Sequence, residues 1–170
     1  FVTEAFTRFI NEKKNRHFEM YLNETNSSRI IDEVSSRKSD LGILFLSNTN
    51  EHFLKKLFRM RDLNFTPLIT VDPHVFMRKG HPLSGYKTVP VGELESFPFV
   101  VFHNNDEFDS STQSINFTEE IVLVDFEPTK QIIHINDRCS SYNIMENTDA
   151  ISVGSGILPE KFSSSNMTAV

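Results

Sequence analysis

Hydrophobic and polar positions follow two alternating patterns along this chain. The first pattern has a period near 3.6 residues and predicts amphipathic helices wherever apolar residues recur at offsets of three and four. It begins with the chain itself, where Val2, Phe6 and Phe9 share one stripe and Glu4 and Arg8 lie opposite. The predicted helices cover residues 1–14, a segment with Ile30, Ile31 and Val34 capped by Ser27 or Ser28, residues 53–58, residues 91–95, and a segment with Tyr142, Ile144 and Met145.

The second pattern consists of strict alternation and of short apolar runs, and it predicts strands. These strands are expected at residues 18–22, 41–46, 65–71, 75–77, 99–102, 131–135 and 150–153. The run at 41–46 is apolar throughout, as in a parallel strand covered on both faces. Turns are expected at residues 80–83 and 154–156, whereas residues 103–128 receive no assignment. Strands that alternate with helices indicate an α/β fold of two small lobes, with the change of lobe near residues 65–73.

Composition narrows the classes of function. The formal net charge is -6, which argues against a segment that itself binds nucleic acid through Lys and Arg. The one cysteine, Cys139, excludes an internal disulfide and fits a reducing compartment. The histidines show no metal-binding spacing, so we predict neither a metal nor a cofactor. No apolar run reaches the length of a membrane span, and we expect a cytoplasmic protein.

Several segments, taken in order, resemble the effector-binding domain of LysR-type bacterial transcription regulators. The first cues are Ser39-Asp40-Leu41-Gly42-Ile43-Leu44 after a helix, Gly80-His81-Pro82-Leu83, and Val91-Gly92-Glu93-Leu94 through Phe97-Pro98-Phe99-Val100. The later cues are Ile135-Asn136-Asp137 and Ser152-Val153-Gly154-Ser155-Gly156-Ile157-Leu158-Pro159. No single cue is specific, and the resemblance depends on their order and spacing across almost the whole chain.

The resemblance implies a two-lobed fold of the type II periplasmic-binding-protein kind, with a small-molecule effector held between the lobes. The expected division is residues 1–66 and 158–170 in lobe I and residues 67–157 in lobe II, with the fold incomplete at both ends. It also implies a winged helix-turn-helix domain outside this chain, through which alone DNA is bound, and a homodimer or higher homo-oligomer. An anion or an amino-acid-like metabolite is the expected effector.

The expected effector contacts lie where strands end. Grouped hydrogen-bond donors at strand ends and helix starts hold an anion, because oriented N–H groups supply positive potential. Arg138, after the strand at 131–135, offers a bidentate grip on a carboxylate, although it equally pairs with Asp137 or Asp149 on the surface. The candidates are Ser47, Asn48, Thr66, His103, Asn104, Asn105 and Arg138. For most of them an ordinary loop or strand hydrogen bond is the alternative interpretation.

Two other functions stay open at this point. The nearest is a free-standing solute-binding protein with the same fold. The other is an enzyme built on the same lobes that converts a small acid, which requires a general acid or base in the cleft, with Asp137 and His103 as candidates. The chain carries no phosphate-binding Gly-rich loop and no nucleophile elbow, so we predict a domain without catalytic activity.

Overall fold

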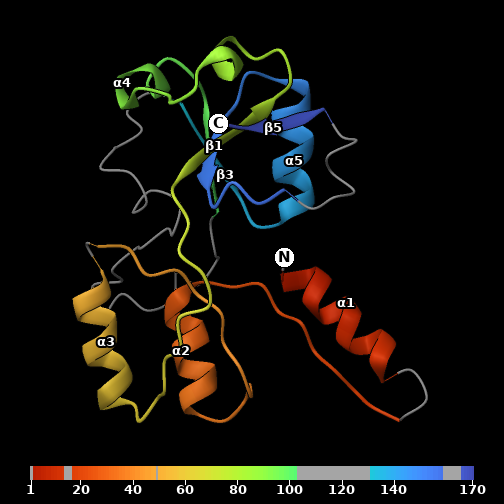
Figure 1. Cartoon of the computed structure of the whole chain (residues 1–170), viewed down its shortest axis with the longest axis vertical. Helices are drawn as coiled ribbons and strands as arrows, with labels where there is room; N and C mark the ends of the chain where they lie inside the picture. Colours follow the sequence, from red (N-terminus) through yellow and green to blue (C-terminus); the bar gives the residue numbers. More distant parts are fainter. Residues whose placement is uncertain (1, 14–16, 49, 103–130, 159–165) are drawn as a thin grey trace.

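The computed structural model describes residues 2–13, 17–48, 50–102, 131–158 and 166–170. Its elements fall into two groups (Figure 1). Helices α1, α2 and α3 form one group, and the strands together with helices α4 and α5 form the other. One extended segment of the chain, residues 63–73, runs between the groups. The predicted α/β class is therefore confirmed.

The helical group comprises α1 (Val2–Glu12), α2 (Ser27–Ser35) and α3 (Glu51–Met60). We predicted that Ser27 or Ser28 caps α2, and this was wrong by one or two residues. Asn26 is the cap, because its side chain accepts a hydrogen bond from the backbone N–H of Arg29 at 2.8 Å. An Asn at this position satisfies one of the donors that a helix leaves unpaired at its start.

Helices α2 and α3 pack on a small apolar core of their own. Ile31 of α2 meets Leu54 and Phe58 of α3, and each of these three side chains is at most 5% exposed. Leu44 and Leu46 cover this core from the segment that joins the two helices. Helix α1, by contrast, has no buried residue, although its apolar stripe is as regular as predicted. The first group thus depends on contacts between α2 and α3.

The second group is built on two small sheets. A three-stranded antiparallel sheet has the order β4-β1-β5, and a two-stranded parallel sheet pairs β2 with β3. The strands are β1 (His74–Arg78), β2 (Phe99–Phe102), β3 (Ile132–Ile135), β4 (Ser152–Gly154) and β5 (Met167–Ala169). A parallel bridge between Phe99 and Ile151 joins the sheets, so β2 lies next to the start of β4.

Helices cover both sheets. Helix α5 (Arg138–Asn147) contacts β1, β3 and β5, and the short α4 (Val91–Leu94) places Leu94 in the core. Phe99, Met77 and Leu94 are at most 2% exposed, as are Ile151 and Val153. This core is larger than the one between α2 and α3, and it holds both sheets in one lobe.

Three of the predicted strands are not strands in the structure, namely residues 18–22, 41–46 and 65–71. The run at 41–46 shows why. Leu44 and Leu46 face the core, whereas Leu41, Ile43 and Phe45 are 77%, 41% and 43% exposed. A strand requires backbone hydrogen bonds to a neighbour. In the part of the chain that the structure describes, no strand pairs with these residues.

The Gly80-His81-Pro82-Leu83 segment forms the predicted turn and continues into a short 3-10 helix, η1 (Pro82–Gly85). The His81 ring is 2% exposed, and its Nδ1 accepts the backbone N–H of Leu83 at 3.1 Å. Its Nε2 therefore carries the proton and donates to the carbonyl of Asp149 at 3.2 Å. Gly80 adopts a φ of 74°, where a side chain is strained. The segment has a structural role.

The end of the chain differs from the expected division. We predicted that residues 158–170 belong to lobe I, yet residues 167–169 form β5 and pair with β1. Val170 continues this pairing through two backbone hydrogen bonds to Val75. The boundaries at 66/67 and 157/158 otherwise stay a prediction. No helix in the described ranges is long and apolar enough to cross a membrane.

Candidate functional site

The carboxyl ends of β2 and β3 meet at one edge of the parallel sheet. Phe102 and Ile135, the last residues of the two strands, are directly paired. Open α/β sheets bind ligands at this edge, because strand ends and helix starts converge there. Helix α5 begins three residues after β3, so its first residue, Arg138, lies at the same edge. The guanidinium carbon of Arg138 is 4.7 Å from the centre of the Phe102 ring.

Arg138 also forms an ion pair with Glu24, which precedes α2 in the helical group. The Nε of Arg138 donates to Oε1 of Glu24 at 2.5 Å, and Nη2 pairs with the same oxygen. The two side chains are 50% and 53% exposed. Because Glu24 and Arg138 lie 114 residues apart in sequence, this ion pair connects the helical group directly to the sheet.

Neither alternative partner of Arg138 is used. Asp149 instead accepts hydrogen bonds from Arg78, at 3.0 Å from Nε and 2.6 Å from Nη2. Asp137 caps α5, where its Oδ1 accepts the backbone N–H of Ser140 at 2.8 Å. The sequence therefore identified Arg138 as a cation at a strand end, but it identified neither Glu24 nor Phe102 as its neighbours. No local sequence pattern indicates a contact such as that between Glu24 and Arg138, which lie 114 residues apart.

The cap on α5 affects the acidity of Asp137. Hydrogen bonds from the Ser140 side chain, and then from the backbone N–H groups of Ser140 and Cys139, hold the pKa of Asp137 below its usual range. A pKa that is lower in the folded than in the unfolded state means that the carboxylate form favours folding. This contribution is fully present above the unfolded-state pKa, and it is lost as the pH falls through the folded-state pKa.

We expect the Ser140→Ala substitution to raise the pKa of Asp137 toward its usual range without reaching it, because the backbone donors remain. A carbon-13 NMR titration of the Asp137 carboxyl group measures this change. The stabilisation that depends on this carboxylate should then be lost at a higher pH in Ser140→Ala than in the wild type. An unchanged titration would show that the Ser140 hydroxyl is not a donor. Ser84→Ala, far from Asp137 in sequence, is the control.

Ser47 and Asn48 lie in the turn that begins α3. The backbone N–H of Ser47 donates to Oδ1 of Asn50 at 2.8 Å, and the Ser47 hydroxyl accepts the Asn50 N–H at 3.3 Å. The Ser47 carbonyl accepts the backbone N–H of Glu51 at 2.9 Å. These are local loop hydrogen bonds of the kind that we gave as the alternative interpretation, and an effector contact of Ser47 stays a prediction. Asn48 is exposed in the same turn.

Of the remaining candidates, Thr66 lies in the described part of the chain. Thr66 is exposed in the segment that connects the two groups, and it is not in a strand. His103, Asn104 and Asn105 lie outside the described residues. The described geometry of the site therefore comprises Arg138 with Glu24 and Phe102, and the turn at Ser47.

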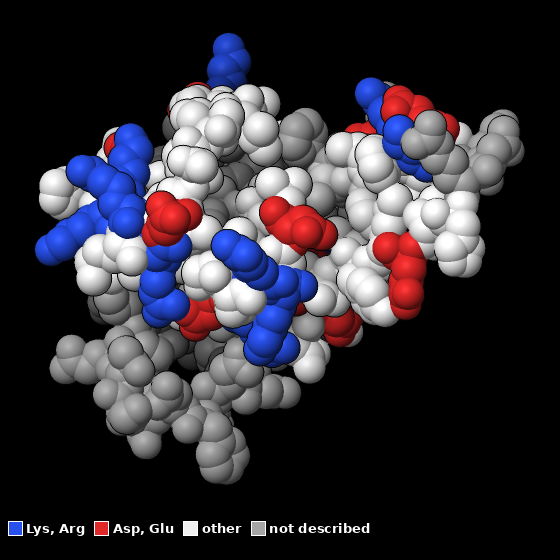
Figure 2. All heavy atoms as spheres, turned by 90° about the horizontal axis from the view of Figure 1, so that it is seen from below, with Lys and Arg blue, Asp and Glu red and all other residues white. Residues whose placement is uncertain are grey.

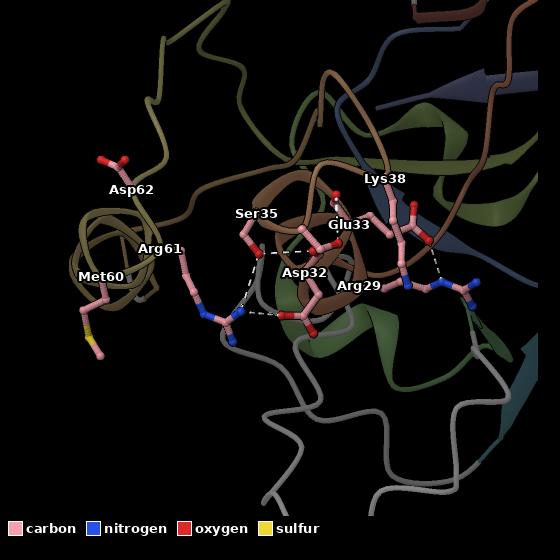
Figure 3. A pocket seen from close by; sticks show the side chains of 9 residues that line it. Arg29, Asp32, Glu33, Ser35, Lys38, Met60, Arg61 and Asp62 are labelled. Atoms are coloured by element: carbon pink, nitrogen blue, oxygen red, sulfur yellow. Dashed lines mark hydrogen bonds and ion pairs between the residues drawn. The ribbon is translucent and has the colours of Figure 1, made fainter.

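Among the surface grooves of the described residues, two lie on the helical group. The larger groove lies between the C-terminal ends of α2 and α3, and its lining includes Asp32, Ser35 and Arg61. Figure 3 shows Arg61 directed at Asp32, with an Nη1 to Oδ1 distance of 3.1 Å, and at Ser35 at 3.4 Å. The smaller groove is lined by His52, Lys56, Arg59 and Met60. Neither groove includes a predicted contact residue.

The charges of the larger groove compensate one another. Arg29 donates to Glu33 at 3.0 Å, and this bond, followed by one from Ser39, holds the pKa of Glu33 below its usual range. Figure 2 shows the molecule from below, with Lys and Arg side chains interspersed with Asp and Glu. Exposed ion pairs of this kind contribute little to stability. The groove is a mixed-charge surface and does not replace the strand edge as the candidate site.

The described residues contain no group of three or more His, Cys, Asp or Glu side chains that could hold a metal ion. Cys139 is exposed and follows Arg138 at the start of α5. At the strand edge, the guanidinium group of Arg138 lies beside the aromatic ring of Phe102.

A comparison with models of known protein families identifies the family of the chain. Residues 2–124 match the model of the LysR substrate binding domain, which includes α1 to α4 and β2. The later cues, Ile135-Asn136-Asp137 and residues 152–159, lie beyond the matched range. A search of curated proteins found no match to the chain. Since the match covers well over half of the sequence, the chain belongs to the LysR substrate-binding domain family, a family of regulatory domains with a periplasmic-binding-protein-like fold.

Proposed function

We propose that this chain is the ligand-sensing domain of a LysR-type transcription regulator. A small effector binds between the two lobes and changes DNA binding by a winged helix-turn-helix domain outside the chain. The observation that carries the proposal, together with the family membership, is the position of Arg138. This cation lies at the carboxyl edge of a parallel strand pair and contacts Glu24 of the other group.

Sensing requires that the effector prefer one arrangement of the lobes. A ligand shifts an equilibrium only by its difference in affinity for the two states, and allosteric coupling typically amounts to about 1 to 3 kcal/mol. A ligand group bound to Arg138 changes a contact between the lobes, so the affinity of the ligand differs directly between the two arrangements. A ligand bound within a single lobe does not change this contact.

The effector is an anion or an amino-acid-like metabolite, since the described part of the edge presents a guanidinium group. The proposed contacts are Ser47, Asn48, Thr66, His103, Asn104, Asn105 and Arg138. In this proposal the domain acts in the cytoplasm as a homodimer or higher homo-oligomer, it contacts DNA only through the other domain, and it catalyses no reaction.

A thermal-shift screen of the chain against small anions, amino acids and metabolic acids tests the proposal. A ligand at a hundredfold excess over its dissociation constant stabilises the folded state by about 2.7 kcal/mol. We expect one ligand class to raise the melting temperature, and Arg138→Ala to abolish this rise.

The matched control is Arg59→Ala, which removes an exposed arginine from α3 and should leave the rise unchanged. If no compound in a broad panel raises the melting temperature, the sensor function is contradicted. If a ligand binds equally well to Arg138→Ala, the position of the site is wrong. Conversion of the ligand during incubation would contradict the absence of catalysis.

A further inference from the structure

Glu24 contacts Arg138 in a way that a ligand could imitate. Two of the three donor nitrogens of Arg138, Nε and Nη2, meet the same oxygen, Oε1 of Glu24. A guanidinium group binds a carboxylate best through two parallel bonds, one to each oxygen. A free carboxylate can orient itself to make both bonds, whereas Glu24 is held by its own chain. The Glu24 contact is therefore weaker than the best contact available to Arg138.

From this geometry we infer that the Glu24 carboxylate occupies the subsite that receives the anionic group of the effector, a small carboxylate. The inference rests on the proposed function and names the chemical class of its ligand. Effector binding then replaces an internal carboxylate with an external one. The net charge around Arg138 stays the same, so no buried charge is created by the exchange.

The exposure of the ion pair makes this exchange feasible. The side chains of Glu24 and Arg138 are about half exposed, and an ion pair between such groups is weakened by water and salt. A fully buried pair would resist displacement, because loss of one partner would leave an uncompensated charge. The Glu24–Arg138 contact therefore excludes other anions only weakly.

Phe102 adds a second recognition element. Its ring lies against the guanidinium group, and it ends β2 at the edge where the strands stop. An aromatic face held in this place favours a carboxylate that carries an apolar or planar group, such as benzoate, over a compact anion such as sulfate.

The exchange also couples the ligand to the lobes. Glu24 lies two residues before Asn26, the cap of α2, and so it is tied to the helical group. Arg138 is the first residue of α5 on the sheet. A ligand that takes the place of Glu24 breaks this ion pair between the two groups. Effector binding and the loss of one contact between the lobes are thereby the same event.

The experiment compares carboxylate binding in the whole chain with and without the competing side chain. Sodium benzoate is titrated at constant ionic strength, maintained with sodium chloride, and binding is followed by the NMR signal of the Arg138 Nε–H group. Glu24→Gln keeps the size of the side chain and removes its charge. Glu51→Gln is the matched control, because Glu51 forms a similarly exposed ion pair with Lys55 within α3.

We expect Glu24→Gln to bind benzoate about two- to fivefold more tightly than the wild type, which corresponds to the usual strength of an exposed ion pair. Glu51→Gln should bind like the wild type. Arg138→Ala lacks the Nε–H group and is followed by the backbone amide signals of α5, and it should not bind. Sulfate should bind less tightly than benzoate in the wild type, in Glu24→Gln and in Glu51→Gln. Equal affinities in the wild type and in Glu24→Gln would overturn the inference.

Small-angle X-ray scattering of the same samples separates this inference from the proposed function. If benzoate binding is tighter in Glu24→Gln but changes the scattering curve of no variant, the subsite stands and the sensor function fails. If a ligand depends on Arg138 and alters the curve, but Glu24→Gln leaves its affinity unchanged, the sensor function stands and the role of Glu24 is wrong.

Discussion

Replacing Phe99 with alanine is expected to lower the free energy of unfolding by about 3 to 5 kcal/mol. Phe99 is 1% exposed, and its strand pairs with β3 on one side and bridges to Ile151 on the other. Its side chain belongs to a buried cluster with Met77 and Val153 of the three-stranded sheet and Val101 of the two-stranded sheet. Truncation removes buried apolar surface and leaves a cavity that both sheets border.

Urea unfolding measures this loss, with Phe53→Ala as the matched control. Phe53 lies on α3 and is 44% exposed, so its truncation should cost less than about 1 kcal/mol. Equal losses in the two variants would contradict the assignment of Phe99 to the core that joins the sheets.

Replacing Gly42 with alanine is expected to destabilise the helical group by about 1 to 3 kcal/mol, a typical cost of overpacking. A Cβ atom at Gly42 would lie 2.4 Å from Cγ2 of Ile30 and 3.1 Å from Cγ2 of Val34. Both neighbours are β-branched residues of α2, whose side chains cannot turn away easily. The segment at 41–46 can approach α2 this closely only because residue 42 has no side chain.

A second substitution tests this explanation. Ile30→Ala removes the contacted atom, so Gly42→Ala should cost less in an Ile30→Ala background than in the wild type. Gly92→Ala is the control, because a Cβ atom there meets nothing within 4 Å and α4 should tolerate alanine. If the cost of Gly42→Ala is the same in both backgrounds, contact with Ile30 is not its cause.

The local pattern was sufficient for the helices and for strands β1 to β4 of the sheet lobe, but not for β5. Helices α2, α3 and α5, the turn at Gly80 and the strands around residues 75, 99 and 132 were predicted within a few residues. Each of these elements has a strong periodic signal, a cap or a turn residue close in sequence. The three failed strands, at 18–22, 41–46 and 65–71, have the alternation or the apolar run but lack a paired neighbour in the described chain.

The candidate site was predicted in part, for a similar reason. Arg138 was identified because a cation directly follows a strand, which is a local signal. Glu24 was missed, because its role depends on a residue 114 positions away. Ser47 bonds to Asn50 and Glu51 at the start of a helix, and its contact with an effector stays a prediction.

The sequence by itself thus determined the α/β class, the helical stripes, the turn at Gly80 and the presence of a cation at a strand end. Periodicity, helix caps and glycine conformations involve only a few neighbouring residues, so they can be recognised in the sequence without the tertiary structure. Only the tertiary structure decided which apolar runs are paired strands, where the end of the chain lies, and which carboxylate meets Arg138. These outcomes depend on contacts between segments far apart in sequence, because a strand needs a neighbour's backbone and an ion pair needs its partner brought within reach.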